Sequence, residues 1–229
     1  MNDTNAFDLI LSGDATLFAI VALSLEVTLL ATFVAAVAGL PFGAFVALTR
    51  FPGRSAIIVL LNGMMGLPPV VVGLLIYLFL SRSGPLGQIG LLYSPQAMII
   101  AQAVLITPII AALSRQVIAD LWEEYREELT AMGVKPIRRV ATLLVDARYS
   151  LVTVLLAGFG RAAAEVGTVM IVGGNIEGYT RVMTTAIALE TSKGNLALAI
   201  GLGLVLISII MAVNAAAWGL RHWSESRAG

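Results

Sequence analysis

Five long stretches of this 229-residue chain contain almost no charge, and this feature constrains its fold more than any other. A helix needs about 20 apolar residues to cross the hydrocarbon core of a bilayer. The stretches cover residues 17–48, 56–80, 97–114, 151–174 and 196–220. Because 59% of the chain is hydrophobic and only 12% is charged, its composition does not suit a soluble domain. The sequence predicts an all-α integral membrane protein with five transmembrane helices in a lipid bilayer.

Lysine and arginine are unevenly distributed over the segments between these stretches. Ten lie on one side of the predicted bilayer and three on the other, while Arg161 falls within the fourth stretch. Because basic residues in short loops stay in the cytoplasm, we predict the N-terminus outside and the C-terminus inside. Residues 1–16 are acidic without a basic residue, which predicts an uncleaved extracytoplasmic segment. Residues 221–229 are expected to form a cytoplasmic tail.

The residue types that most catalytic and metal sites need are scarce in this chain. It has no cysteine and one histidine, His222, so cysteine nucleophiles, zinc–thiolate sites and histidine-rich metal sites are excluded. A net charge of zero gives no support to nucleic-acid binding. Neither Lys135 nor Lys193 follows a glycine, so a phosphate-binding loop is missing. We predict no catalytic residue, no metal site, no cofactor and no ATPase activity on this chain.

Much of the charge is concentrated between the third and fourth stretches, in residues 115–150. The sequence "WEEYREELTAMGVKPIRRV" (122–140) holds four glutamates, three arginines and a lysine. Helix formers run as far as Met132, Gly133 can end a helix in the left-handed conformation, and Pro136 suits the first turn of the next helix. The pattern predicts a helix, a turn and an amphipathic helix that together contact a cytoplasmic partner.

Three charged residues fall inside the predicted spans. Arg161 and Glu165 are four residues apart, so a continuous helix would carry them on one face. They form either a pair that fixes this helix in the bundle or a site where Arg161 admits an oxyanion. The pair is favoured because Glu165 would repel the same anion. Glu26 either pairs with Arg161 or extends outward, and we expect all three on the translocation path or in helix pairing.

Proline and glycine indicate where the helices break or approach one another. Pro68 and Pro69 interrupt the second stretch, so freed backbone carbonyls there must bind neighbouring groups or line a cavity. Gly39 and Gly43 allow another backbone to come close to the first stretch. Residues 182–189 are apolar but too short to cross a bilayer, which predicts a short interfacial or partly re-entrant helix.

The charged segment resembles the cytoplasmic loop of ABC importer permeases. Their pattern is Glu-Ala-Ala, three residues, Gly, nine residues, and then Ile-x-Leu-Pro. Glu127, Glu128 and Leu129 occupy the first three positions and Gly133 the glycine. The chain departs from this pattern at Glu128 and Leu129, and again at Asp146, which stands where the proline is expected.

Further stretches resemble one branch of that family. "GLPPVVVGLLIYLFLSRSGPLG" (66–87) and "GFGRAAAEVGTVMIVGGNI" (158–176) are similar to the second and fourth core spans of molybdate and tungstate permeases. "DARY" (146–149) and "GYTRVMTTAIALETSKG" (178–194) resemble the tungstate-specific permeases. The resemblance covers residues 23–218, nearly the whole chain.

The resemblance implies a type I importer permease core, residues 17–220, that works as a homodimer in the inner membrane of a prokaryote. It implies that the charged segment contacts a separate ATPase subunit, which binds ATP and Mg²⁺. The coupling residues would be Glu127, Glu128, Leu129, Gly133 and Lys135. Lys135, together with Arg138 and Arg139, has an alternative role as an anchor near lipid headgroups.

The resemblance also implies the substrate and how it arrives. An extracytoplasmic tungstate-binding protein would deliver an oxyanion, tungstate in the first place, with molybdate or sulfate as alternatives of the same shape and charge. The resemblance implies that the stretch with Pro68 and Pro69 lies along the translocation path. The remaining alternative is an ATP-independent anion carrier. Such a carrier needs carboxylates for a coupling ion as well as internal repeats, and only Glu26 and Glu165 are available in the spans.

Overall fold

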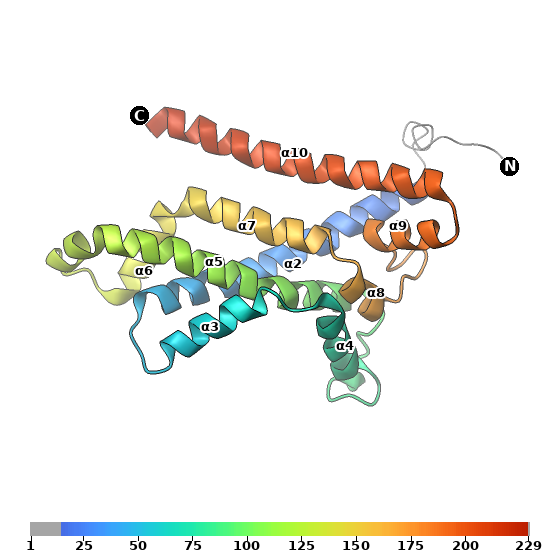
Figure 1. Cartoon of the computed structure of the whole chain (residues 1–229), viewed down its shortest axis with the longest axis horizontal. Helices are drawn as coiled ribbons and strands as arrows, with labels where there is room; N and C mark the ends of the chain where they lie inside the picture. The colour runs from blue at the N-terminus through green and yellow to red at the C-terminus, as the bar shows by residue number, and fades with distance from the viewer. Residues whose placement is uncertain (1–14, 229) are drawn as a thin grey trace. The chain divides into compact units, whose positions relative to one another are not determined.

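The computed structural model describes residues 15–228, and side chains for all of these except residues 15, 136, 137 and 220–228. The predicted segment 1–16 therefore lies outside the described residues except for its last two. The described part is all-helical, which confirms the all-α part of the prediction (Figure 1). Its elements are α2 (Ala15–Leu48), α3 (Arg54–Met64), α4 (Pro69–Leu80), the short helix η1 (Gly87–Ile89), α5 (Pro95–Ala131), α6 (Pro136–Asp146), α7 (Arg148–Ala163), α8 (Gly167–Gly173), α9 (Met183–Ser192) and α10 (Leu196–Ala228).

Among the described residues, three segments are each long and apolar enough to cross a membrane as one helix. They are Thr16–Leu48 of α2, the whole of α5, and Leu196–Gly219 of α10. Two bent pairs, α3 with α4 and Arg138–Asp146 of α6 with α7, would raise the number to five. The structure thus contains three to five candidate spans, and the prediction of five depends on counting each bent pair as one.

Two of the predicted spans are not single helices. In the second, 56–80, α3 ends at Met64 and α4 begins at Pro69, with Pro68 as its N-cap residue. Pro68 and Pro69 have no N–H to donate, so they start a new helix more easily than they continue an old one. In the fourth, 151–174, α7 ends at Ala163 and α8 begins at Gly167. The prediction that one continuous helix carries Arg161 and Glu165 is therefore wrong.

Two other helices are longer than predicted. We expected the third span to end at residue 114, but α5 continues to Ala131 and includes the first helix of the charged segment. There is no glycine or proline between Pro108 and Gly133, so nothing in the sequence stops the helix where the hydropathy falls. Similarly, α10 continues to Ala228, so the predicted tail 221–229 is helical in its described residues.

The chain divides into two compact units, one made of residues 1–31, 68–102 and 162–229 and the other of residues 32–67 and 103–161. The first unit has two apolar clusters. One joins α2, α4, α5 and α8 through buried side chains that include Val27, Leu80 and Met98. The other joins α2, α9 and α10 through Leu17, Met183, Ala186 and Leu202.

Glycines bring the helices of the second unit into backbone contact. A Cβ at Gly43 of α2 would overlap Ser114 Oγ and the Ala111 carbonyl oxygen of α5. At Gly39 a Cβ would lie 3.0 Å from Ile110 Cγ2, and Ser114 Oγ donates a hydrogen bond to the Gly39 carbonyl at 3.4 Å. At Gly158 of α7 a Cβ would lie 2.9 Å from the Ile110 side chain. The predicted close packing at Gly39 and Gly43 is confirmed.

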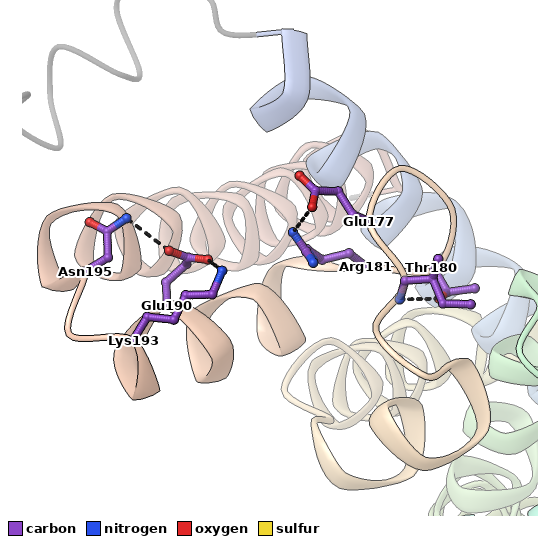
Figure 2. A network of polar contacts seen from close by, with 7 residues as sticks. Glu177, Thr180, Arg181, Glu190, Lys193 and Asn195 are labelled. Atoms are coloured by element: carbon purple, nitrogen blue, oxygen red, sulfur yellow. Dashed lines mark hydrogen bonds and ion pairs between the residues drawn. The ribbon is translucent and has the colours of Figure 1, made fainter.

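The short apolar helix predicted at 182–189 is confirmed as α9, which ends in a polar cluster at the turn into α10. Glu190, only 9% exposed, accepts hydrogen bonds from Lys193 Nζ at 2.8 Å and from Asn195 Nδ2 at 3.0 Å (Figure 2). Chiefly because Lys193 donates to this carboxylate, the pKa of Glu190 lies below its ordinary value. The ionised carboxylate therefore stabilises the turn between the two helices.

We expect Glu190→Gln to lower the free energy of unfolding by about 1 kcal/mol at neutral pH, since it removes the charge that Lys193 and Asn195 bind. The folded-state pKa is depressed below the ordinary value of 4.5. This stabilisation is therefore fully present above that value and is lost as the pH falls through the folded-state pKa. The difference in thermal midpoint between the natural protein and the variant should shrink as the pH falls. Thermal unfolding of both proteins at a series of pH values measures this difference in midpoint.

Glu177→Gln is the matched control for this prediction. Glu177 pairs with Arg181 at 3.3 Å, but its side chain is 73% exposed (Figure 2). Exposed ion pairs contribute little, so its thermal midpoint should stay close to that of the natural protein at every pH. A deficit of Glu190→Gln that stays constant or grows in acid would contradict the role given to the Glu190 carboxylate.

Candidate functional site

The charged segment forms a helical hairpin in the second unit. Gly133 lies between α5 and α6 with a φ of 63°. Its N–H donates to the Thr130 carbonyl at 3.1 Å, and the Val134 N–H donates to the Leu129 carbonyl at 3.2 Å. These two bonds define a Schellman turn, which satisfies carbonyls at the end of a helix. Pro136 then occupies the first turn of α6. The predicted helix, left-handed glycine and second helix are all confirmed.

Gly133 is required for its backbone conformation and not for space. A Cβ at this position would meet nothing within 4 Å. The positive φ, however, is unfavourable for a residue with a Cβ, and more so for a β-branched one. Leu129 contributes a backbone carbonyl to the same turn. Two residues of the family pattern, Leu129 and Gly133, therefore act together to end α5.

Arg139 connects α6 back to the turn and to α5. Its Nε donates to the Val134 carbonyl at 2.7 Å, and its guanidinium lies 5.4 Å from the centroid of the Trp122 ring. A cation over an indole face at this distance is attracted by the ring. Arg139 is thus part of the hairpin, whereas Lys135 and Arg138 are exposed. The headgroup-anchor alternative for all three stays a prediction.

An acidic surface runs along the end of α5. The side chains of Glu123, Glu124, Glu127 and Glu128 are exposed, and within the described part of the chain none of them forms a hydrogen bond or ion pair. Met132 follows them at the tip of the hairpin with 76% of its surface exposed. A partner with basic groups and an apolar recess would complement this surface.

Pro69 and Glu165 come together in the first unit, where α4 packs against α8. Thr168 Oγ1 donates to the Pro69 carbonyl at 2.7 Å, and the Thr168 N–H donates to Glu165 Oε1 at 3.0 Å. The Glu165 carbonyl in turn accepts from Thr184 Oγ1 at 2.8 Å. Glu165 is only 3% exposed. The carbonyl that Pro68 leaves without its helical partner is that of Met64, and it accepts the Leu67 N–H at 3.2 Å. The part of Pro68 and Pro69 in a translocation path stays a prediction.

Small residues allow this contact between α4 and α8. A Cβ at Gly73 would lie 2.9 Å from Thr168 Cα, and one at Gly167 would lie 2.9 Å from Val70 Cγ2. Gln102 of α5 also binds the α7–α8 break, because its Nε2 donates to the Ala162 carbonyl at 3.1 Å. Irregular backbone at membrane depth requires such internal partners, since lipid offers none.

Arg161 and Glu26 occupy different kinds of position. Arg161 lies in the last turn of α7, where a cation stabilises the negative end of the helix dipole. Glu26 is exposed on α2, although the next two residues are buried. Their parts in ion pairing or in anion passage, like that of Glu165, stay predictions.

Sequence reasoning missed the hydroxyl and amide groups that complete these contacts. They are Gln102, Thr168 and Thr184 at the helix breaks, and Ser24, whose Oγ accepts the Met183 N–H at 2.8 Å. An unpaired polar group is costly in an apolar span. Each lone Ser, Thr or Gln within an apolar stretch is therefore a signal that a nearby backbone group needs a partner.

Apolar helices, broken spans and a charged hairpin define a multi-pass membrane protein of the permease type. Residues 39–228 match the family described as the inner membrane component of binding-protein-dependent transport systems. The chain belongs to this family, the permeases of ABC importers. It is accordingly an inner membrane protein.

Curated relatives match the chain along most of its length. A probable anion ABC transporter permease of Haloferax volcanii is 39% identical over 218 residues, covering 93% of this chain and 94% of the relative. The tungstate uptake permease TupB of Peptoclostridium acidaminophilum is 38% identical over 217 residues, 95% of each chain. TupB of Campylobacter jejuni is 39% identical over 165 residues, 72% of this chain and 69% of the relative. A putative molybdenum permease of Bacillus subtilis has a lower identity to this chain, 28% over 204 residues.

Proposed function

We propose that this chain is the permease of an ABC importer that carries tungstate across the inner membrane. Relatives named for tungstate uptake are 38–39% identical to it, whereas relatives named for molybdenum transport are 26–28% identical. Tungstate and molybdate have the same charge and nearly the same shape. Molybdate, and after it sulfate, is therefore the second candidate substrate.

The observation that carries this proposal is the hairpin between α5 and α6. Its turn is fixed by two hydrogen bonds at Gly133, and its exposed face presents four carboxylates without a partner among the described residues. We assign Glu127, Glu128, Leu129, Gly133 and Lys135 to contact with a separate ATPase subunit. That subunit would bind ATP and Mg²⁺, and the hairpin would transmit its movement to the spans.

The same proposal requires a second copy of the chain and a fixed orientation. Three to five candidate spans are too few to enclose and gate a path for a hydrated anion, so a homodimer about a two-fold axis is proposed. The distribution of lysine and arginine favours an outer N-terminus and an inner hairpin. An extracytoplasmic binding protein would then deliver the anion to the face opposite the hairpin.

Reconstituted transport tests this function. The permease, its ATPase and its binding protein are placed in vesicles, and uptake of tungstate is measured with and without ATP on the ATPase side. We expect uptake only when all three proteins and ATP are present, with molybdate and sulfate competing less well than unlabelled tungstate. Uptake by the permease alone without ATP would identify a carrier instead and overturn the proposal.

A further inference from the structure

A pocket of about 650 Å³ opens beside the segment that joins α4 to α5. Its polar lining comes from Tyr77 near the end of α4, from Ser81, Arg82 and Ser83 directly after it, and from Tyr93. This size is within the range of pockets that bind small molecules. In the proposed orientation the segment lies on the extracytoplasmic side, where the binding protein would release its anion.

The wall of this pocket is a tightly built loop. The Leu86 N–H donates to the Phe79 carbonyl at 3.0 Å, and the Gly84 N–H donates to the Ser81 carbonyl at 2.7 Å. A Cβ at Gly84 or at Gly87 would overlap backbone carbonyl oxygens. The loop therefore folds back on itself so closely that only glycine fits at these two positions, and this holds the polar side chains in place.

Tyr93 lies in the wall in a conformation that a bulky residue rarely adopts. Its φ is 62°, and its N–H donates to the Val172 carbonyl at 2.9 Å. Its ring packs so closely on Gly174 that a Cβ there would lie 2.8 Å from Tyr93 Cδ1. Such strain persists where the surroundings impose it, and it concentrates at functional sites. A hydrogen bond with Tyr77 raises the pKa of Tyr93 above its ordinary value.

Among the described residues that line the pocket, Arg82 is the one with a formal charge. It is exposed, and within the described part of the chain its side chain has no hydrogen bond or ion pair. Arg181 differs, because it lines a smaller pocket of about 150 Å³ and is paired with Glu177 at 3.3 Å (Figure 2). The Arg82 pocket thus offers an uncompensated guanidinium next to several hydroxyl groups.

We propose that the Arg82 pocket binds a tetrahedral oxyanion on its way from the binding protein to the translocation path. The inference rests on the proposed function, since that function makes an oxyanion the substrate. A guanidinium presents donors in a fork that matches two oxygens of such an anion. Ser81 Oγ already donates to the Leu78 carbonyl at 3.0 Å, so the further donors are the Ser83 hydroxyl, which has only a 3.4 Å contact with Ser81 Oγ, and the hydroxyl groups of Tyr77 and Tyr93. The volume admits the anion with part of its water shell.

Equilibrium dialysis of tungstate against the full-length permease in lipid nanodiscs tests this site. The binding protein and ATPase are left out, and bound tungsten is measured by elemental mass spectrometry. We expect Arg82→Gln to weaken binding about tenfold or more, because a charge-assisted contact is lost. Arg82→Lys keeps the positive charge but lacks the forked donors of a guanidinium. Its affinity for tungstate should therefore lie between those of the natural protein and Arg82→Gln. Arg181→Gln is the control and should bind like the natural protein.

Two outcomes would overturn the site. The first is no saturable binding by the natural protein, and the second is equal binding by Arg82→Gln. In the second case the binding protein is added in a separate capture assay, where weaker capture by Arg82→Gln would assign the pocket to an acidic side chain of that partner. Neither outcome removes ATP-driven uptake by the natural complex, so failure of this site is distinguishable from failure of the proposed function.

Discussion

Gly43→Leu is expected to prevent the second unit from folding. A Cβ at Gly43 would already overlap Ser114 Oγ and the Ala111 carbonyl, and it would lie 2.9 Å from the Arg115 backbone nitrogen. Two of these three obstacles are backbone atoms of α5, so no change of rotamer relieves the overlap. Overpacking of a helix contact costs about 1–3 kcal/mol of stability where side chains can adjust. Because backbone atoms cannot adjust in this way, we expect Gly43→Leu to cost at least the upper value of that range. The yield of monodisperse protein after size-exclusion chromatography and its thermal midpoint measure the effect.

Gly160→Leu provides the control for this prediction. Gly160 also lies in an apolar helix of the second unit, but a Cβ there would meet nothing within 4 Å. The added side chain should therefore leave both the yield and the thermal midpoint nearly unchanged. If Gly43→Leu gave the same yield and midpoint as Gly160→Leu, α2 and α5 would not be in the backbone contact described above.

The hairpin could be predicted from the sequence because its signals are local. The left-handed Gly133 and the proline at the start of α6 act through the backbone of their own residues. The break at Pro68 and Pro69 is local in the same sense, because a proline lacks the N–H wherever it stands. Such features need no knowledge of what packs around them.

The break between α7 and α8 could not be predicted in this way. The residues "AAAEVG" (162–167) contain no proline, and their alanines favour a continuing helix. The break instead depends on partners that are remote in sequence. The Glu165 carbonyl binds Thr184, and the Pro69 carbonyl binds Thr168, the residue that also donates to the Glu165 carboxylate. Tertiary contacts here override local propensity.

The length of α5 was missed for a different reason. Hydropathy reports where a helix leaves the lipid, whereas the end of a helix depends on capping and on helix-breaking residues. The apolar stretch ends near Ser114, but α5 ends at Ala131, where the turn at Gly133 satisfies its last carbonyls. This continuity gives the hairpin its function in the proposed transporter, since a movement imposed at Glu127 acts on the same helix that forms the third predicted span.

Gly133→Val is expected to abolish coupling to the ATPase while leaving most of the fold intact. Valine is β-branched and strongly disfavours the left-handed conformation that Gly133 adopts, so the two hydrogen bonds of the turn would be lost. The direction in which α6 leaves the turn would change, and the acidic surface at Glu127 and Glu128 would no longer fit one partner cleft. We expect ATP-dependent tungstate uptake to fall about tenfold or more, because even small misplacements at a coupling contact are costly. Uptake into vesicles and co-purification of the ATPase measure this.

The thermal midpoint and Gly133→Asn distinguish a coupling defect from general misfolding. Because a Cβ at Gly133 would contact nothing within 4 Å, Gly133→Val should lower the midpoint far less than Gly43→Leu does. Asparagine tolerates the left-handed conformation better than other residues with a Cβ, so Gly133→Asn should retain the turn, the co-purifying ATPase and most of the uptake. Equal loss of uptake in the valine and asparagine variants would mean that the side chain itself is excluded by the partner. Full uptake in the valine variant would mean that the turn transmits nothing, and the assignment of this hairpin to ATPase coupling would fail.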